Sequence, residues 1–309
     1  GDDVEILRGW APAVLAINDP AALRGIRKMA DGVWHSGEVE NGFSKTIGDV
    51  EHGAELVSDT QPLMCAIDYG NPEYLDRCMA GMRSMRDVWT AVNARGHRHF
   101  KTHYYSATAL STNGARAADV ALNGRAVNPG IWLLWYNRHP AVVDLLGQWC
   151  RAWIEDAART DGGKPAGFVP GSIRFEDDRL GGFAEGWWQT KDYFSDFESV
   201  GYTVTLYNTM FAMFAATGDD FYLTTLRATA NAAMAEARQP SPQTPPGSAA
   251  WAAKICDNED IADVLAKYRL FTGATEFDDF LLRRGSPYVR WLIHGDANGL
   301  VTALSNVVE

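Results

Sequence analysis

Several common functional signatures are absent from this 309-residue sequence. It has no GxxxxGK[ST] loop, no GxGxxG after a predicted strand and no GxSxG elbow, which excludes the usual nucleotide, dinucleotide and serine-hydrolase sites. No window approaches 18 uninterrupted apolar residues, so we expect no transmembrane helix. Cysteine is scarce as well. The four cysteines lack CxxC spacing and lie in apolar helical contexts, which predicts buried free thiols rather than a zinc site.

Positive charge is also in short supply. The chain has 39 Asp and Glu against 28 Lys and Arg, giving a formal net charge of −11. Such a balance disfavours nucleic acid and anionic membranes, so neither is expected as a partner. Hydrophobic content of 46% and charged content of 22% are typical of a globular protein. The length is sufficient for a sizeable core.

One unit recurs along the chain: an apolar helix, a short turn built from Asn-Pro or Gly-Asp, and an amphipathic helix. Pro at the first helical position pre-sets φ, and a preceding Asn or Asp caps the exposed N–H groups. Gly permits the left-handed end of the helix before the turn. The clearest turns lie at residues 71–72, 137–140, 217–223 and 294–297, with weaker copies at 18–20 and 272–274.

These hairpins must stack, because each has more apolar surface than it can bury alone. Their spacing is too irregular for a TPR or HEAT solenoid. We therefore predict an all-α fold, an (α/α) toroid or incomplete barrel of helical hairpins with long active-face loops. Residues 1–309 would form this single catalytic domain, and an irregular helical bundle is the alternative. The Gly-rich, charged segments 31–60 and 159–200 interrupt the helices and are expected to carry function.

Residues 95–105 (RGHRHFKTHYY) hold three of the seven histidines, two arginines, a lysine and two tyrosines. Such a run can bind an anion and transfer protons near neutral pH. As a strand, it would place alternate residues on one face, namely His97, His99, Lys101, His103 and Tyr105. As a helix, it would pair His99 with His103 for a metal, but no third ligand lies nearby. A substrate site is favoured over a metal site and over a solvated basic loop.

Two further polar groups are candidates for chemistry. His52 lies among carboxylates that include Glu55, and a carboxylate that accepts its second N–H would raise its basicity. Arg125 precedes a helix predicted to begin at Gly130, where it would face an anion together with the helix N-terminus. Asn128 is the expected cap of that helix, which is the plainer interpretation of this segment.

An aromatic group follows in the second irregular segment. Trp187 and Trp188 stand next to each other, and Tyr193 lies close behind them. Exposed Trp faces bind sugar rings, although Trp is as common in protein cores. The nearby glycines and polar residues favour a cleft wall.

The predicted ring of hairpins, the aromatic cleft and the order His52, Arg98, Tyr104 resemble the (α/α)-barrel polysaccharide lyases. The run HRHFKTHYY is similar to the alginate and glucuronan lyases of polysaccharide lyase family 38, with motif similarity over residues 49–130. The resemblance implies β-elimination on a 4-linked uronic-acid polymer, with no cofactor and no metal. The implied partner is an acidic polysaccharide or oligosaccharide, and the implied location is secreted or periplasmic.

The resemblance also implies roles for individual residues. Tyr104 would be the general acid and, with its pKa lowered by a cation, the base too. His52 would be the base or would neutralise the substrate carboxylate, while Arg98 and His103 would tune Tyr104 and hold that carboxylate. The implied substrate contacts are Tyr105, His99, Lys101, Arg125, Glu55, Trp187, Trp188 and Tyr193. Tyr105 is nearly as good a catalytic candidate as Tyr104.

Three alternatives remain open. An (α/α) glycoside hydrolase acting on uronosides would need a pair of carboxylates at catalytic separation. Glu51, Glu55, Asp59, Asp192 and Glu198 supply such candidates. A sugar 2-epimerase-like enzyme would share the barrel and use histidine pairs. A carbohydrate-binding toroid without catalysis is the third alternative.

Overall fold

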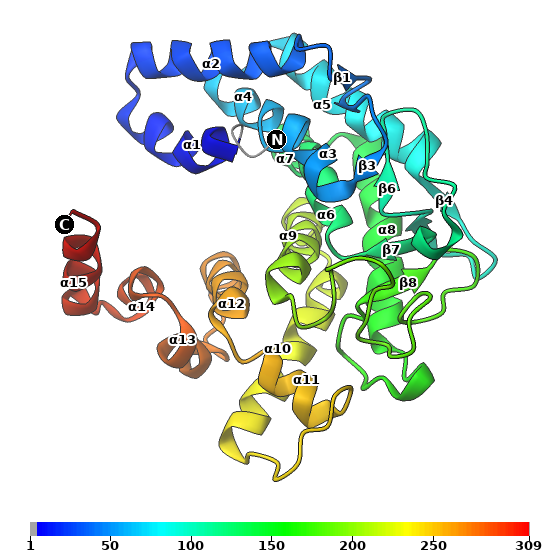
Figure 1. Cartoon of the computed structure of the whole chain (residues 1–309). Helices are drawn as coiled ribbons and strands as arrows, with labels where there is room; N and C mark the ends of the chain where they lie inside the picture. Colours follow the sequence, from blue (N-terminus) through cyan, green and yellow to red (C-terminus); the bar gives the residue numbers. More distant parts are fainter. Residues whose placement is uncertain (1–4, 309) are drawn as a thin grey trace.

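The structure of this chain is a computed structural model that describes residues 5–308 (Figure 1). It is mostly helical, which confirms the all-α class. None of the described helices is both long enough and apolar enough to cross a membrane. The helices are α1 (Glu5–Ile17), α2 (Pro20–Trp34), α3 (Val50–Val57), α4 (Gln61–Ile67), α5 (Pro72–Ser84), α6 (Asn123–Ala126), α7 (Asn128–Asn137), α8 (Pro140–Ala158), α9 (Val200–Thr217), α10 (Thr224–Arg238), α11 (Ala249–Ile255), α12 (Glu259–Thr272), α13 (Asp278–Arg284), α14 (Pro287–His294) and α15 (Ala297–Val308).

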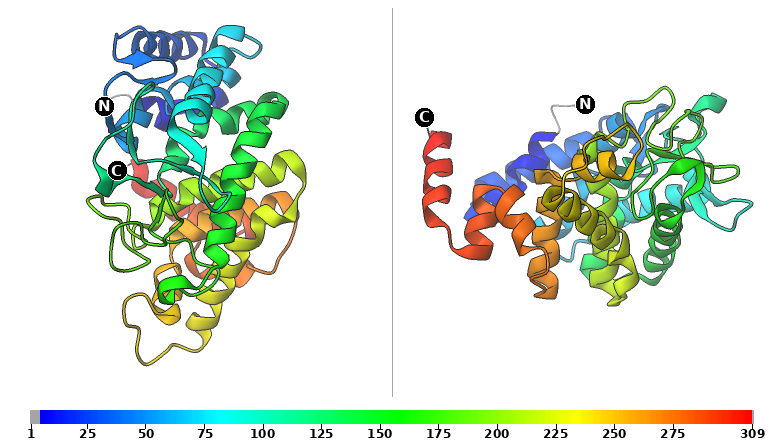
Figure 2. Two further views of the ribbon diagram at one scale, coloured as in Figure 1. Left: turned by 90° about the vertical axis from the view of Figure 1, so that its right-hand side faces the viewer. Right: turned by 90° about the horizontal axis from the view of Figure 1, so that it is seen from below.

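The helices follow one another along an open arc, from α1 through α8 to α15 (Figure 1). Neighbours along the chain pack on each other, as α4 does on α5, α8 on α9 and α14 on α15. Helices α12 to α15, orange to red, lie at the far end of the arc from the green loops of residues 159–199 (Figure 2). The loops of residues 159–199 follow directly on the long helix α8 and lie beside it (Figure 1).

The predicted hairpins are confirmed by the caps that separate their helices. Asp19 caps α2, with its Oδ1 accepting from the backbone N of Ala21 at 2.9 Å and of Ala22 at 2.8 Å. Asn71 caps α5 in the same way, and Pro72 occupies the first helical position. Gly218 ends α9 in the left-handed region, at φ +73°. Local turn chemistry thus defines the hairpins.

The strands form short two-stranded antiparallel ribbons between the helices. β1 pairs with β2, β3 with β6, β4 with β5, and β7 with β8. Their bounds are β1 (Val39–Glu40), β2 (Phe43–Ser44), β3 (Gly48–Asp49), β4 (Thr90–Val92), β5 (Arg98–Phe100), β6 (Tyr104–Tyr105), β7 (Ala118–Val120) and β8 (Ser172–Arg174). The run 95–105 is consequently neither one strand nor a helix. Its two halves, β5 and β6, belong to different ribbons.

An aromatic core holds these ribbons against α8. The ring of Trp89 lies 4.8 Å from that of Tyr105, and Phe100 meets Trp149 of α8 edge-on at 5.7 Å. All four rings are fully or almost fully buried. Burial of this size contributes several kcal/mol per ring, roughly 3–5 by the effect of truncation. The backbone on either side of β5 and β6 is therefore rigidly placed.

The four cysteines are free and buried, as the sequence predicts. Cys65 and Cys78 lie on adjacent helices with their sulfur atoms 3.8 Å apart. Burial raises the pKa of the Cys150 and Cys256 thiols, which keeps both protonated. Both thiols pack in the hydrophobic core.

Candidate active site

The β3–β6 ribbon brings together residues that lie about fifty positions apart in the sequence. Asp49 of β3 is the direct partner of Tyr104 of β6. Asp49 is also the N-cap of α3, and its Oδ1 accepts from the backbone N of His52 at 3.2 Å. His52 therefore lies in the first turn of a helix that starts next to Tyr104. One short ribbon thus places Tyr104 opposite the residue that caps the helix of His52.

Asp49 and His52 form a carboxylate–imidazole pair. The Nδ1 of His52 lies 2.9 Å from both carboxylate oxygens of Asp49. This hydrogen bond raises the pKa of His52, and the nearby carboxylates of Glu55 and Glu51 add to the rise. The His52 side chain is 64% exposed. With Nδ1–H donated to Asp49, Nε2 carries the lone pair and can act as a base.

Tyr104 is half-buried among charged and aromatic groups. The guanidinium of Arg116 lies 3.6 Å from the centroid of its ring, and Tyr193 meets the ring edge-on at 5.7 Å. Burial raises the pKa of Tyr104 and outweighs the lowering effect of Arg116. The expectation of a lowered pKa is therefore wrong for the described structure. Tyr104 keeps its proton near neutral pH, which suits an acid.

Three residues around Tyr104 carry buried polar atoms that have no hydrogen-bond partner among the described residues: Nε2 of His103, Nε of Arg116 and the hydroxyl of Tyr193. His103 donates its Nδ1–H to the carbonyl of Ala118 at 3.3 Å. Burial lowers the pKa of His103 to about 4, so the ring is neutral and Nε2 is an acceptor. Each unpaired group costs about 1–3 kcal/mol, a cost that a ligand supplying the missing partner offsets.

The other cations of the run 95–105 lie elsewhere. Arg98 donates from Nε to Gln148 of α8 and from Nη1 to Thr90, both at 2.9 Å. These bonds direct Arg98 towards α8, so its predicted role beside Tyr104 has no contact to support it. Lys101 is partly exposed, and burial lowers its pKa. His99 is fully buried and belongs to a separate cluster with His97.

Tyr105 is not a substrate contact in this structure. Its side chain is fully buried, and its hydroxyl donates to Asn123 at 3.1 Å. Tyr105 points into the core because adjacent strand residues face opposite sides. Of the two tyrosines, Tyr104 is the one whose side chain solvent can reach.

The predicted aromatic wall is wrong for Trp187, which is only 2% exposed. Its Nε1 donates to the carbonyl of Gly247 at 3.0 Å, and its ring packs on Phe197. Trp188 is half-buried against Trp251 at 5.8 Å. Both indoles hold the loop of residues 239–248 to the body of the protein. Of Trp187, Trp188 and Tyr193, Tyr193 is the one whose ring contacts the ring of Tyr104.

Arg125 serves an internal acidic cluster. Its guanidinium lies 2.6 Å from Asp59, 3.3 Å from Glu51 and 3.9 Å from Glu55. These carboxylates balance Arg125, so it does not face an external anion as predicted. Asn128 does not cap α7 either, because its Nδ2 donates to the carbonyl of Ser58 at 2.6 Å.

Arg116 is the residue at this site that the sequence did not single out. It ends the short 3₁₀ turn Gly114–Arg116, which Asn113 caps. The chain reaches this position by folding back over β6, where the backbone N of Ser111 donates to the carbonyl of Tyr104 at 2.9 Å. The Asn-Gly pair at 113–114 indicates a turn, but nothing in the sequence indicates what the turn covers.

A second concave region lies at a distance from this cluster. A hollow of about 990 Å³ is lined by α10, α11 and α13, with Lys254 and Arg238 at its edge. Its other arginines, Arg283 and Arg284, both pair with Asp257. This hollow has no tyrosine or histidine in its lining, so the Tyr104 cluster is the stronger candidate for proton-transfer chemistry.

Comparison of the chain with protein-family models, curated proteins and solved structures returned no match. The assignment of function therefore depends on the geometry of the site.

Proposed function

We propose that this chain is a polysaccharide lyase that cleaves a 4-linked uronic-acid polymer of the alginate or glucuronan type by β-elimination. One observation carries the proposal: the Asp49–His52 pair lies beside the half-buried Tyr104, and Arg116 covers the Tyr104 ring. This set combines a base, an acid and a cation. Elimination next to a carboxylate requires those three functions.

The proposed reaction assigns one step to each group. Nε2 of His52 takes the C5 proton of the uronate, and the electron pair of that C–H bond forms the C4=C5 double bond. The C4–O4 bond breaks, and Tyr104 gives its proton to the departing O4. A proton then passes from His52 back to Tyr104 through solvent, so the enzyme is restored.

Arg116 would hold the substrate carboxylate, which makes the C5 proton more acidic by neutralising its charge. Its guanidinium is partly exposed above the Tyr104 ring. The acid and the base would each contribute about 10²–10⁴ in rate.

The proposal includes the architecture that the resemblance implies. The arc of hairpins would be an incomplete (α/α) barrel, with the irregular segments on its active face. The acidic polysaccharide would cross this face near β6 and the start of α3.

The direct test follows the absorbance of unsaturated uronate while the protein is incubated with alginate, glucuronan and similar polyuronates. We expect a rise on at least one polymer and a loss of about 10²-fold or more in Tyr104→Phe, since the variant lacks the acid. Tyr69→Phe is the matched control, because Tyr69 is 68% exposed and its ring contacts Trp135 and Tyr136 of α7. It should retain the wild-type rate.

Two outcomes would overturn the proposal. Reducing ends that form without new absorbance would indicate a hydrolase that uses paired carboxylates. A Tyr104→Phe variant as active as the Tyr69→Phe control would remove Tyr104 from the chemistry.

A further inference from the structure

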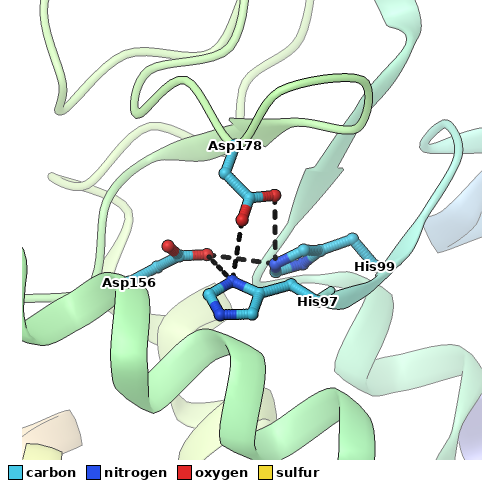
Figure 3. Close-up of side chains that lie close together, drawn as sticks. All are labelled: His97, His99, Asp156 and Asp178. Carbon is cyan, nitrogen blue, oxygen red and sulfur yellow. Dashed lines mark hydrogen bonds and ion pairs between the residues drawn. The ribbon is translucent and has the colours of Figure 1, made fainter. Parts of the chain in front are cut away.

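A second cluster of titratable side chains lies close together where β5 approaches α8 (Figure 3). It consists of His97, His99, Asp156 and Asp178, which offer ligand atoms within 4.8 Å of one another. Nε2 of His99 lies 3.0 Å from Oδ2 of Asp156, and Nδ1 of His97 lies 2.7 Å from Oδ2 of Asp178. Nδ1 of His97 is 3.5 Å from Asp156, and Nε2 of His99 is 3.9 Å from Asp178.

Two atoms of this cluster have no hydrogen-bond partner among the described residues, although both are buried. They are Nδ1 of His97 and Oδ2 of Asp178, whose side chain is fully inaccessible. The two atoms lie close together without the alignment of a hydrogen bond. This arrangement is expected where both atoms are ligands of the same third atom.

The outward-facing nitrogen of each histidine is bound to a separate carboxylate. Nδ1 of His99 pairs with Oδ2 of the buried Asp119 at 2.9 Å, and Nε2 of His97 pairs with Glu155 at 2.9 Å. Metal-ligating histidines are held in this way, because the carboxylate fixes the tautomer and the orientation of the ring. The inward-facing nitrogens, Nδ1 of His97 and Nε2 of His99, lie against Asp178 and Asp156, and a bound ion would take the place of the proton on each of them.

The carboxylates are oriented in the same manner. Oδ1 of Asp156 accepts from Nη1 of Arg159 at 2.6 Å, which leaves Oδ2 facing the cluster. Asp178 accepts from the side-chain amide of Asn93 through Oδ1. The backbone of Asp178 lies in the left-handed region at φ +57°, which is uncommon for a residue other than Gly. Strain of this kind is maintained where the position of a side chain matters.

We propose that His97, His99, Asp156 and Asp178 bind one divalent transition-metal ion, and that this ion is zinc. A tetrahedral zinc ion with bonds of about 2.0–2.2 Å separates its ligand atoms by about 3.4 Å. The four histidine–aspartate distances in the cluster, 2.7, 3.0, 3.5 and 3.9 Å, lie on either side of that value. Two imidazoles favour zinc over calcium or magnesium, which prefer all-oxygen sites. The two ligand carboxylates balance the charge of the ion.

The site is structural in character, because four protein ligands close it and three of them are fully buried. It joins three parts of the chain: β5 and the turn before it, the end of α8, and the irregular segment 159–199. Zinc would hold this last segment, which also carries Tyr193, to the body of the protein. The proposal does not depend on the lyase function.

Metal content tests the proposal directly. Protein purified without added metal, or incubated with zinc and then passed through a desalting column, should carry one zinc ion per chain by elemental analysis. Cobalt exchanged into the same protein should give the intense visible absorption of a tetrahedral Co²⁺ site. Zinc at a hundredfold excess over its Kd should raise the melting temperature of the chelator-treated protein by about 5 °C.

Asp178→Asn is the main variant, because its amide keeps the size of the side chain while weakening the ligand. It should lose the bound zinc and the cobalt spectrum, and so should His97→Ala. His35→Ala is the matched control, because His35 is exposed and lies outside the cluster, and it should retain both signals. A wild-type protein that binds no stoichiometric zinc and gives no tetrahedral cobalt spectrum would overturn the proposal, as would equal zinc content in Asp178→Asn.

Discussion

The run 95–105 supplies two clusters of opposite character. Around Tyr104 the side chains of Tyr104, Arg116 and Tyr193 are partly exposed. Around His99 the rings and carboxylates are almost fully buried, and the outward-facing atoms are bonded. The bend between β5 and β6 separates the two clusters. Histidines of the same run therefore have different surroundings, depending on whether they belong to β5 or lie next to β6.

The difference shows how to distinguish a reactive site from a structural one. A structural cluster has a closed outer layer of hydrogen bonds, as His99 has in Asp119. A reactive site keeps titratable groups accessible, as the half-buried Tyr104 and the exposed His52 are here. Neither the number of histidines nor their spacing carries this distinction.

The two clusters meet at β7, and Asp119→Ala is expected to disrupt both. Oδ2 of Asp119 accepts from Nε1 of Trp149 at 2.8 Å, from Nε1 of Trp153 at 3.0 Å and from His99. Removing the carboxylate leaves these buried donors unpaired, so the free energy of unfolding should fall by about 4 kcal/mol. Urea denaturation measures this loss.

The control for this variant is Asp144→Ala in α8, since Asp144 is exposed and accepts a hydrogen bond from Gln148 of the same helix. It should change the free energy of unfolding by less than about 0.5 kcal/mol. Equal stability of the Asp119→Ala and Asp144→Ala variants would mean that the two clusters do not share this anchor.

Sequence reasoning reached the hairpins because their signals are local. Asp19, Asn71 and Gly218 act on backbone groups within a few residues of themselves, and their chemistry is readable from the letters alone. The sequence also indicated that residues 95–105 carry functional groups, because histidine, arginine and tyrosine are concentrated there. The arrangement of the hairpins along the arc could not be predicted, because it depends on how many apolar helix faces pack on one another at the same time.

The two clusters were less accessible to sequence reasoning. His99 meets Asp156 across 57 residues, and Asn93 meets Asp178 across 85. No spacing motif joins ligands that far apart, so the third and fourth ligands could not be found near the histidines. Trp187 was misplaced for a related reason, because exposure depends on the loop at Gly247 that covers it.

The second prediction concerns His103, which lies beneath the reactive cluster. Burial lowers its folded pKa to about 4, whereas its unfolded pKa is about 6.5. The unfolded chain therefore takes up a proton as the pH falls below about 6.5, while the folded chain does not until about pH 4. The free energy of unfolding should decline across this window by about 3 kcal/mol from this group alone.

The pH dependence is checked by urea denaturation of the wild type and His103→Gln at several values between pH 4.5 and 7. The variant should show a shallower decline, because glutamine does not titrate. His35→Gln is the control, since His35 is exposed, and it should follow the wild type. Identical slopes for all three proteins would show that His103 is not held neutral by burial.

The third prediction tests whether Asp49 makes His52 a base. Asp49→Asn keeps the size of the side chain and the cap of α3, since Asn is also a good N-cap. It removes the charge that raises the pKa of His52, so the acidic limb of the activity profile should move to lower pH. The maximal rate should fall by about a hundredfold, or about 2.7 kcal/mol of barrier, because the ring is weaker as a base and less well oriented.

Asp192→Asn separates this effect from a general loss of negative charge near Tyr104, because Asp192 also raises the pKa of that tyrosine. Its rate should stay within about threefold of the wild type, and its acidic limb should not move. The free energy of unfolding of Asp49→Asn should also remain close to the wild-type value. If Asp49→Asn instead keeps the full rate with an unmoved limb, then His52 takes no proton from substrate. The open cluster around Tyr104 would then need another base.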